Sequence, residues 1–359
     1  MRRSISIQSR SGRVSSPLCT AFSRQGAGLL FALLSCVGCG DKPATEPAEV
    51  AQWDTLVSAH DSALLGIWGS SVEDVWAVGS RAKTETVGGP AVLHYDGAQW
   101  EAMDTSQESL DLWWVFGFVG GPVFLSGSGG TILRYDANSH SPSKFTRMTT
   151  PGTGAVFGLW GSAEDDLWAC GGQFGGGGGG FVWHYDGEAW TALEGVPFDK
   201  ILLKVGGRGK NDVSFTGEVG LVLTWDGSAL KRMDIETDAS IFSVSGNEDG
   251  WVAVGGEPFR GAIYEGDGAG WKSAAPVARD ALRGVALSGE SAYAVGNGGL
   301  VMARGADGWQ EQDTDGVGGD LHAVWIDPDG GVWAVGGSFD TLPLTDGVLI
   351  HQGAPVQGL

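Results

Sequence analysis

The sequence predicts an all-β fold, a seven-bladed β-propeller, and three observations carry this prediction. One phrase recurs seven times between Leu65 and the C-terminus: an apolar strand, a second strand ending in Gly, and a third ending in a turn, often Asp-Gly. Its spacing is about 43 residues, which suits a four-stranded propeller blade. No stretch shows the sustained spacing of an amphipathic helix. The chain is therefore expected to form a ring of repeated four-stranded sheets.

A glycine at the end of the second strand marks each unit. The seven are Gly79, Gly127, Gly171, Gly217, Gly255, Gly296 and Gly336. Three residues before it, five units carry an aromatic side chain: Trp76, Phe124, Trp168, Tyr293 and Trp333. Units four and five have Ser214 and Val252 there, with Phe215 and Trp251 one residue away. Aromatic rings fill the wedge between neighbouring blades, so the 16 tryptophans are expected mainly in the core.

The first unit shows the remaining strands clearly. Its second and third strands are predicted at 75–78 and 91–95, where β-branched and aromatic residues are bounded by glycine and aspartate. The third strand ends at Asp96-Gly97, and Asp-Gly permits the positive φ of a tight hairpin. A fourth strand then begins at Trp100, and at Trp190, Trp271 and Trp309 in later units. Unit two has a longer loop at this turn.

The last unit lacks a fourth strand, because only a short tail follows His351. The start of the domain offers the missing piece. Residues 51–54 (Ala-Gln-Trp-Asp) echo residues 98–101 (Ala-Gln-Trp-Glu), and Trp53 stands at the spacing of a fourth-strand tryptophan. The N-terminal strand is therefore predicted to complete the seventh blade. Such closure removes exposed sheet edges and ties the two ends together.

Residues 1–35 have the features of a bacterial lipoprotein signal peptide. Five arginines and no acid precede a short apolar stretch, 26–34, that is too short to span a bilayer. The boundary Leu33-Leu34-Ser35-Cys36 predicts lipidation at Cys36, with Cys39 as the alternative. Residues 36–50 are predicted to be a flexible tether, and residues 51–359 the propeller. The protein is expected to be exported and lipid-anchored to the bacterial outer membrane, on its periplasmic or surface face, and to contact membrane through that anchor only.

Charge and cysteine content exclude several classes of partner. The whole chain carries a net charge of −21; without the signal arginines, 17 basic residues remain against 43 acidic ones, a net charge of −26. Nucleic acid is disfavoured as a partner, since it would be repelled. The few cysteines imply no disulfide framework. Cys170 stands where other units have valine, so it is expected to be a small buried hydrophobic residue. The protein is expected to be a monomer.

The repeat resembles that of a known group of proteins. The phrase from Trp68-Gly69-Ser70-Ser71 to Asp74-Val75-Trp76-Ala77-Val78-Gly79 is similar to a propeller repeat of exported bacterial proteins, many of them lipoproteins. Residues 327–336, with Asp329-Gly330 before Trp333, also look like the repeat of two-component-regulator sensor propellers. The resemblance implies the fold, but propellers include enzymes, binding proteins and scaffolds alike.

Motifs for chemistry are largely missing. His94 and His184 occupy one repeat position, which favours a structural role over catalysis. No histidine spacing predicts a metal site, and no cofactor is expected. Acidic stretches such as 164–166 and 327–329 lack the alternating-oxygen pattern of a specific calcium loop, so a structural calcium is left open.

Unequal connections after the second strand are the best pointer to function, because a binding surface must depart from the repeat. These connections are long in units one, three, five and seven. In propellers they share one face with the connections between blades. The residues predicted to bind are Arg81, Lys83, Phe174, Phe259, Arg260, Phe339 and Asp340. The competing interpretation is that each Phe folds back on its own loop.

The sequence thus predicts a non-catalytic, envelope-anchored propeller that binds a protein or glycan partner on this face. The alternative is a lyase or hydrolase acting on polysaccharide, with acids such as Asp212, Glu218 or Asp340 at the channel mouth.

Overall fold

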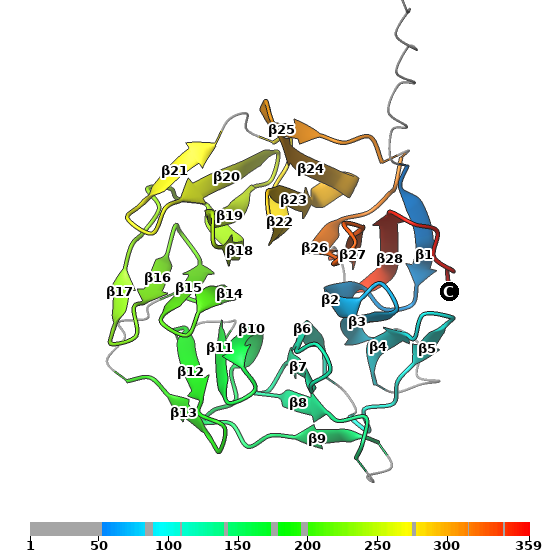
Figure 1. Ribbon diagram of the computed structural model, residues 1–359, viewed down its shortest axis with the longest axis horizontal. Coiled ribbons are helices and arrows are strands. Elements are labelled where there is room, and N and C mark those ends of the chain that lie inside the picture. The colour runs from blue at the N-terminus through cyan, green and yellow to red at the C-terminus, as the bar shows by residue number, and fades with distance from the viewer. Residues whose placement is uncertain are drawn as a thin grey trace, which may run out of the picture. The chain divides into compact units, whose positions relative to one another are not determined.

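The structure is a seven-bladed β-propeller, which confirms the predicted fold class. The computed structural model describes residues 52–82, 89–107, 110–139, 143–173, 179–194, 200–274, 278–314, 316–339 and 342–359. In these residues 28 strands form seven four-stranded antiparallel sheets around a central axis (Figure 1). Within the same residues, no helix combines the length and the apolar composition needed to cross a bilayer.

The blades follow one another in chain order. The first three contain β2 (Leu64–Ser71), β3 (Asp74–Arg81), β4 (Pro90–Tyr95), β5 (Trp100–Ala102), β6 (Leu112–Gly117), β7 (Val123–Gly127), β8 (Ile132–Tyr135), β9 (Phe145–Arg147), β10 (Ala155–Ala163), β11 (Asp166–Gly172), β12 (Phe181–Tyr185) and β13 (Trp190–Ala192). The next three contain β14 (Leu202–Gly209), β15 (Asp212–Gly217), β16 (Val222–Trp225), β17 (Leu230–Arg232), β18 (Ser240–Asn247), β19 (Gly250–Glu257), β20 (Arg260–Gly266), β21 (Trp271–Ala274), β22 (Leu282–Ser288), β23 (Ser291–Gly296), the short 3-10 turn η1 (Asn297–Gly299), β24 (Leu300–Gly305) and β25 (Gly308–Glu311).

The seventh blade joins the two ends of the domain. It contains β26 (Leu321–Ile326), β27 (Val332–Ser338), β28 (Thr345–Gln352) and, as its outer strand, β1 (Asp54–His60). β1 runs antiparallel to β28, with Asp54 opposite His351. Trp53 is buried among residues of the sixth and seventh blades, including Val301 and Val348. It occupies the interface that a fourth-strand tryptophan fills elsewhere.

The glycine that marks each unit has a steric reason. It ends the second strand, where the chain crosses the segment that enters the first strand of the same blade. A Cβ on Gly79 would overlap the carbonyl oxygen of Ala63, and one on Gly336 would overlap that of Asp320. The other five marker glycines meet the corresponding carbonyl in the same way. Any side chain there would force the second strand away from the inner strand, so the repeat requires glycine.

The two faces of the ring differ in their connections. The turns between first and second strands, and between third and fourth, lie on one face, which we call the hairpin face. The connections between second and third strands share the opposite face, the loop face, with the connections between blades. Backbone hydrogen bonds join the two kinds of connection there, as from Ser128 N to the Asp111 carbonyl at 2.9 Å. The inner strands β2, β6, β10, β14, β18, β22 and β26 surround the axis (Figure 1).

Candidate binding site in the central channel

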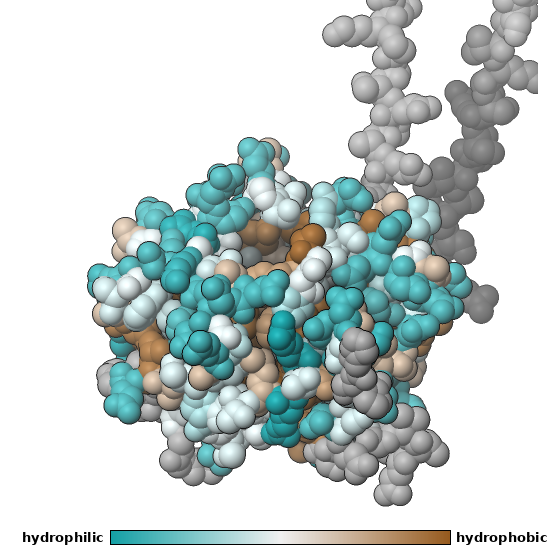
Figure 2. Space-filling model, turned by 60° about the horizontal axis from the view of Figure 1, so that its bottom comes forward, coloured by the Kyte–Doolittle hydropathy of each residue, from teal (hydrophilic) through white to brown (hydrophobic). Residues whose placement is uncertain are grey.

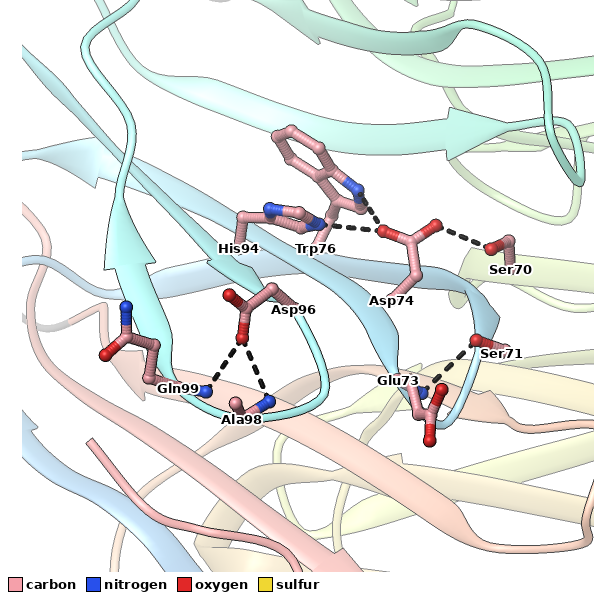
Figure 3. A network of polar contacts seen from close by, with 9 residues as sticks. All are labelled: Ser70, Ser71, Glu73, Asp74, Trp76, His94, Asp96, Ala98 and Gln99. Carbon is pink, nitrogen blue, oxygen red and sulfur yellow. Dashed lines mark hydrogen bonds and ion pairs between the residues drawn. The ribbon is translucent and has the colours of Figure 1, made fainter. Parts of the chain in front are cut away.

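A serine, an aspartate, a histidine and a tryptophan form the most conspicuous polar network of the first blade (Figure 3). Asp74 lies at the start of β3. Its Oδ1 accepts a hydrogen bond from Nε1 of Trp76 at 3.0 Å and forms another with Nε2 of His94 at 2.8 Å. Its Oδ2 accepts Oγ of Ser70 at 2.5 Å. Burial alone would raise the pKa of Asp74, but hydrogen bonds from His94 and Ser70 outweigh it and lower that pKa.

Parts of the same network recur in other blades. In the third blade Asp166 binds Ser162 Oγ at 2.5 Å and His184 Nε2 at 2.7 Å. In the seventh, Asp327 accepts Nε1 of Trp333 at 2.9 Å, and His351 packs on that indole. A hydrolytic triad needs the histidine beside the serine, whereas here the carboxylate lies between them. We conclude that the network braces the first three strands of a blade, as the recurrence of His94 and His184 indicated.

The predicted binding residues differ in their exposure and contacts. Phe259 is 85% exposed, and its backbone N–H donates to Asp280 Oδ1 at 3.1 Å. Arg260 beside it is also exposed. Phe339 is 38% exposed and stacks on His322, with ring centroids 3.7 Å apart. The Arg81 guanidinium lies 3.8 Å from Asp111 on the surface. Lys83, Phe174 and Asp340 lie outside the described residues.

Two acids of the enzymatic alternative, Asp212 and Glu218, lie far apart in the structure. Asp212 begins β15 on the hairpin face, where it pairs with Arg208. Glu218 follows the other end of β15, and its Oε2 accepts the backbone N–H of Ile201 at 3.0 Å on the loop face. A six-residue strand separates them by roughly 20 Å. Asp212 and Glu218 therefore lie on opposite faces, because successive hairpins send the two ends of a strand to opposite faces, and Asp340 lies outside the described residues.

The channel is shaped by a register irregularity that all seven inner strands share near their loop-face ends. One residue of each inner strand bulges at this point; the seven are Leu65, Trp113, Phe157, Leu203, Phe242, Arg283 and His322. Contacts between neighbouring blades follow, as between Trp113 and Phe157 and between Arg283 and Phe242. We call these residues the bulge ring.

The next residue of each inner strand decides what fills the channel below the bulge ring. Five blades have a small residue at this level: Gly66, Gly158, Ser243, Gly284 and Ala323. The second and fourth blades have Trp114 and Lys204. With little side chain from the other blades, these two meet: Lys204 Nζ lies 3.4 Å from the centroid of the Trp114 ring.

Cationic and imidazole groups therefore converge at the loop-face end of the channel. Lys204 is only 9% exposed, and burial lowers its pKa to about 7, an effect that Cys170 partly opposes. Burial likewise lowers the pKa of Arg283, although Asp320 and Asp280 oppose it. The pKa of His322 falls to about 3, first through burial and then through the charges of Arg283 and Lys204. The lysine and arginine thus act on one imidazole from different blades.

Sequence reasoning missed Lys204, Arg283 and His322. Each is a polar residue in an otherwise apolar inner strand, as in Leu202-Leu203-Lys204-Val205, and each stands two or three residues after a loop. That departure from the repeat was a readable signal. It could not be tied to a common place without the bulge, which sets which residue of each strand reaches the axis.

Below Trp114 the channel continues as a cavity of about 220 Å³ towards the hairpin face. Val115, Leu159 and Val324 line it together with Ser243 and Ser245, and Trp68, Trp160 and Trp325 stand near its end. In Figure 2 apolar residues lie recessed among hydrophilic ones on the face shown. Within the described residues, no group of His, Cys, Asp or Glu is placed to hold a metal ion.

Comparison with known proteins supports the fold. No protein-family model and no curated protein sequence matches the chain. Solved structures do: YCF48 bound to D1 peptide (14% identity, TM-score 0.60) covers 84% of this chain and 97% of its own. YCF48 from Cyanidioschyzon merolae (14%, 0.62) covers 84% and 99%. The WD40 β-propeller domain of Doa1 (11%, 0.65) covers 86% and 99%. At these identities the likeness shows a shared β-propeller fold.

Proposed function

We propose that this protein is a non-catalytic binding module that captures a segment of a protein partner at the loop-face end of its central channel. The observation that carries the proposal is the convergence of Lys204 and Arg283 with aromatic side chains at one mouth of a strongly acidic propeller. Aromatic residues and arginine are enriched where proteins bind proteins. Phe259, at the tip of the β19–β20 hairpin, extends this surface outward.

The position of Phe259 links the loop face to the channel. Asp280 accepts the N–H of Phe259 and also lies 3.4 Å from Asn297 Nδ2, and Asn297 Oδ1 accepts Nε of Arg283 at 2.9 Å. One chain of hydrogen bonds thus runs from the hairpin tip to the bulge ring. A segment bound against Phe259 could also reach Arg283.

A similar protein supports the class of ligand. YCF48 has been solved with D1 peptide bound. A propeller of this architecture can therefore hold a peptide, although the low identity carries no residue across. We favour a protein over a glycan because the channel end carries Lys204 and Arg283, whereas an open row of aromatic faces would suit a sugar chain.

We also propose that the module is exported and held at the outer membrane by a lipid on Cys36, from the signal features of residues 1–35. Replacing Cys36 with Ser should abolish incorporation of labelled palmitate and release the protein from the membrane fraction. Cys39→Ser is the matched control and should change neither. Loss of labelling in Cys39→Ser alone would move the anchor to Cys39.

Site-specific crosslinking in intact envelopes tests the binding site. A photoreactive phenylalanine at position 259 should form a covalent adduct with a protein partner, whereas the same residue at the exposed Val119 of the hairpin face should not. The triple variant Phe174→Ala, Phe259→Ala, Phe339→Ala should weaken that partner's affinity at least about tenfold with little change in melting temperature. Equal adducts from both faces, or an adduct with polysaccharide, would contradict a protein site on the loop face.

A further inference from the structure

We propose that the loop-face end of the channel is a carboxylate-binding site, in which Lys204 and Arg283 supply the charge beside His322. This inference rests on the proposed function and specifies its chemistry: the captured segment inserts one carboxylate into the channel. The carboxylate comes either from an Asp or Glu side chain or from the C-terminus of the partner.

Lys204 is a buried cation with few compensating contacts. Its Nζ donates a long hydrogen bond of 3.4 Å to the Phe157 carbonyl and lies over the Trp114 ring. Among the described residues no Asp or Glu forms an ion pair with it. A buried ammonium without a carboxylate is destabilising, and residues that destabilise a fold are characteristic of binding sites.

Arg283 and His322 complete the set from two further blades. Arg283 uses Nε for Asn297 and lies over the Phe242 ring, with its guanidinium carbon 4.2 Å from the ring centroid. Its terminal nitrogens have the fork geometry that a carboxylate matches. The Nε2 atom of His322 is buried, and no described residue forms a hydrogen bond with it. Because neutral His322 has a single N–H, which its hydrogen bond with the Gly337 backbone uses, Nε2 is an acceptor, and the anion is held by Lys204 and Arg283.

The acids nearby act on Arg283 and not on Lys204. Asp280 and Asp320 both act on Arg283. Asp280 already accepts backbone N–H groups of Phe259 and Ala281, and Asp320 accepts that of Gly298 at 2.8 Å. Neither contributes to the pKa shift of His322, on which the acting charges are those of Arg283 and Lys204. The two charges that act on His322 are thus both positive, inside a protein whose net charge is −21.

Trp114 and Lys204 lie directly below the bulge ring, so a side chain or chain end that enters from the loop face meets Lys204 there. Trp113, Phe157 and Phe242 line the approach and suit the apolar stem of such a group. Since Asp280 and Asp320 already act on Arg283, the charge left without a carboxylate is that of Lys204, and one carboxylate matches it.

Titration with small carboxylates tests the inference on the whole propeller. The probes are N-acetylglutamate methylamide, which carries a side-chain carboxylate, N-acetylglycine, which ends in a terminal carboxylate, and the neutral N-acetylglutamine methylamide. The readout is the NMR resonance of the Lys204 ε-carbon in protein with labelled lysine, assigned by its loss in Lys204→Met. At least one carboxylate should shift it saturably with a millimolar dissociation constant, and the neutral amide should not. The tighter carboxylate identifies the source.

Variants and pH sharpen the test. Tryptophan fluorescence should report carboxylate binding that is lost in Lys204→Met, weakened about tenfold in Arg283→Gln, and unchanged in the exposed control Lys231→Met. Lys204→Met should also raise the melting temperature, because it removes a buried charge. The affinity for carboxylates should fall as pH rises past 7, because Lys204 loses its proton there. Arg283 stays charged over this range. Cys170 stays neutral because burial raises its thiol pKa, and His322 stays neutral because its pKa is low.

Two results would overturn the inference: no saturable shift with either carboxylate, or a shift with inorganic phosphate alone. The outcome is separable from that of the proposed function. If carboxylates bind but position 259 captures no protein, the carboxylate site stands and the protein-binding proposal fails. If position 259 captures a partner whose affinity Lys204→Met and Arg283→Gln leave unchanged, the protein-binding proposal stands and the carboxylate inference fails.

Discussion

At the scale of single residues, the same types of side chain serve two different purposes. Ser70, Asp74 and His94 contain the chemical groups of a hydrolase, yet their order in space makes them a brace. Lys204 has no such structural partner. The difference lies in hydrogen bonding: the polar atoms of the first-blade brace find partners within their own blade, whereas the channel groups are buried with weak or missing partners.

The brace predicts a stability change that depends on pH. Asp74→Asn should destabilise the propeller by about 1–3 kcal/mol at pH 7, because hydrogen bonds to a charged acceptor are replaced by weaker ones. Since the pKa of Asp74 is lowered in the fold, its contribution is complete above the unfolded pKa of about 3.8 and is lost as pH falls through the folded value. The difference between variant and wild type should therefore shrink in acid.

Urea denaturation between pH 2.5 and pH 7 measures this difference. The exposed neighbour Glu73→Gln is the matched control, since its side chain takes no part in the brace, and it should change the free energy of unfolding by less than about 0.5 kcal/mol. A variant Asp74→Asn as stable as Glu73→Gln at pH 7 would mean that the network contributes nothing to folding.

At the scale of strands, the sequence predicted which residues form the ladders better than it predicted where they end. The fifth unit has a long interval between Gly255 and its third strand, which predicts a loop there. The structure extends both strands instead, to Glu257 and from Arg260, and leaves only Pro258 and Phe259 in the turn. The number of residues between two strands cannot distinguish a loop from a longer hairpin. The turn itself carries no usual signal either, because Phe259, at φ 63°, stands where glycine or asparagine is usual.

The irregular aromatic residues of units four and five follow from side-chain alternation. Ser214 stands where other blades place a tryptophan that fills the interface with the next blade. Trp251 lies one residue earlier than its counterparts, so it points to the opposite face of its sheet. There it packs with Val222 and Ile241 and fills the interface between the fourth and fifth blades. The sequence indicated that these residues supply bulk; the sheet geometry determines which interface receives it.

At the scale of the whole molecule, the two ends of the domain share one blade. This arrangement was predictable because Trp53 repeats a spacing that the other units establish. What could not be predicted is the role of the C-terminal tail: the Leu359 N–H donates to the Leu56 carbonyl at 3.1 Å, and the Gln357 carbonyl accepts Nε1 of Trp100 at 3.2 Å. The tail carries no repeat signal, yet it joins β1 to the first blade.

The shared blade predicts that the stability of the ring depends on its first strand. Trp53→Ala should lower the free energy of unfolding by about 3–5 kcal/mol, because it leaves a large cavity between the sixth and seventh blades. A chain that starts at residue 58 should melt at a much lower temperature than one that starts at residue 51, since loss of residues 51–57 uncovers the edge of β28 and removes Trp53. Thermal denaturation followed by circular dichroism compares the two directly, with the full chain as the control for residues 1–50. If the chains starting at 51 and 58 melt together, β1 does not close the ring in solution, and the seventh blade is stable with three strands.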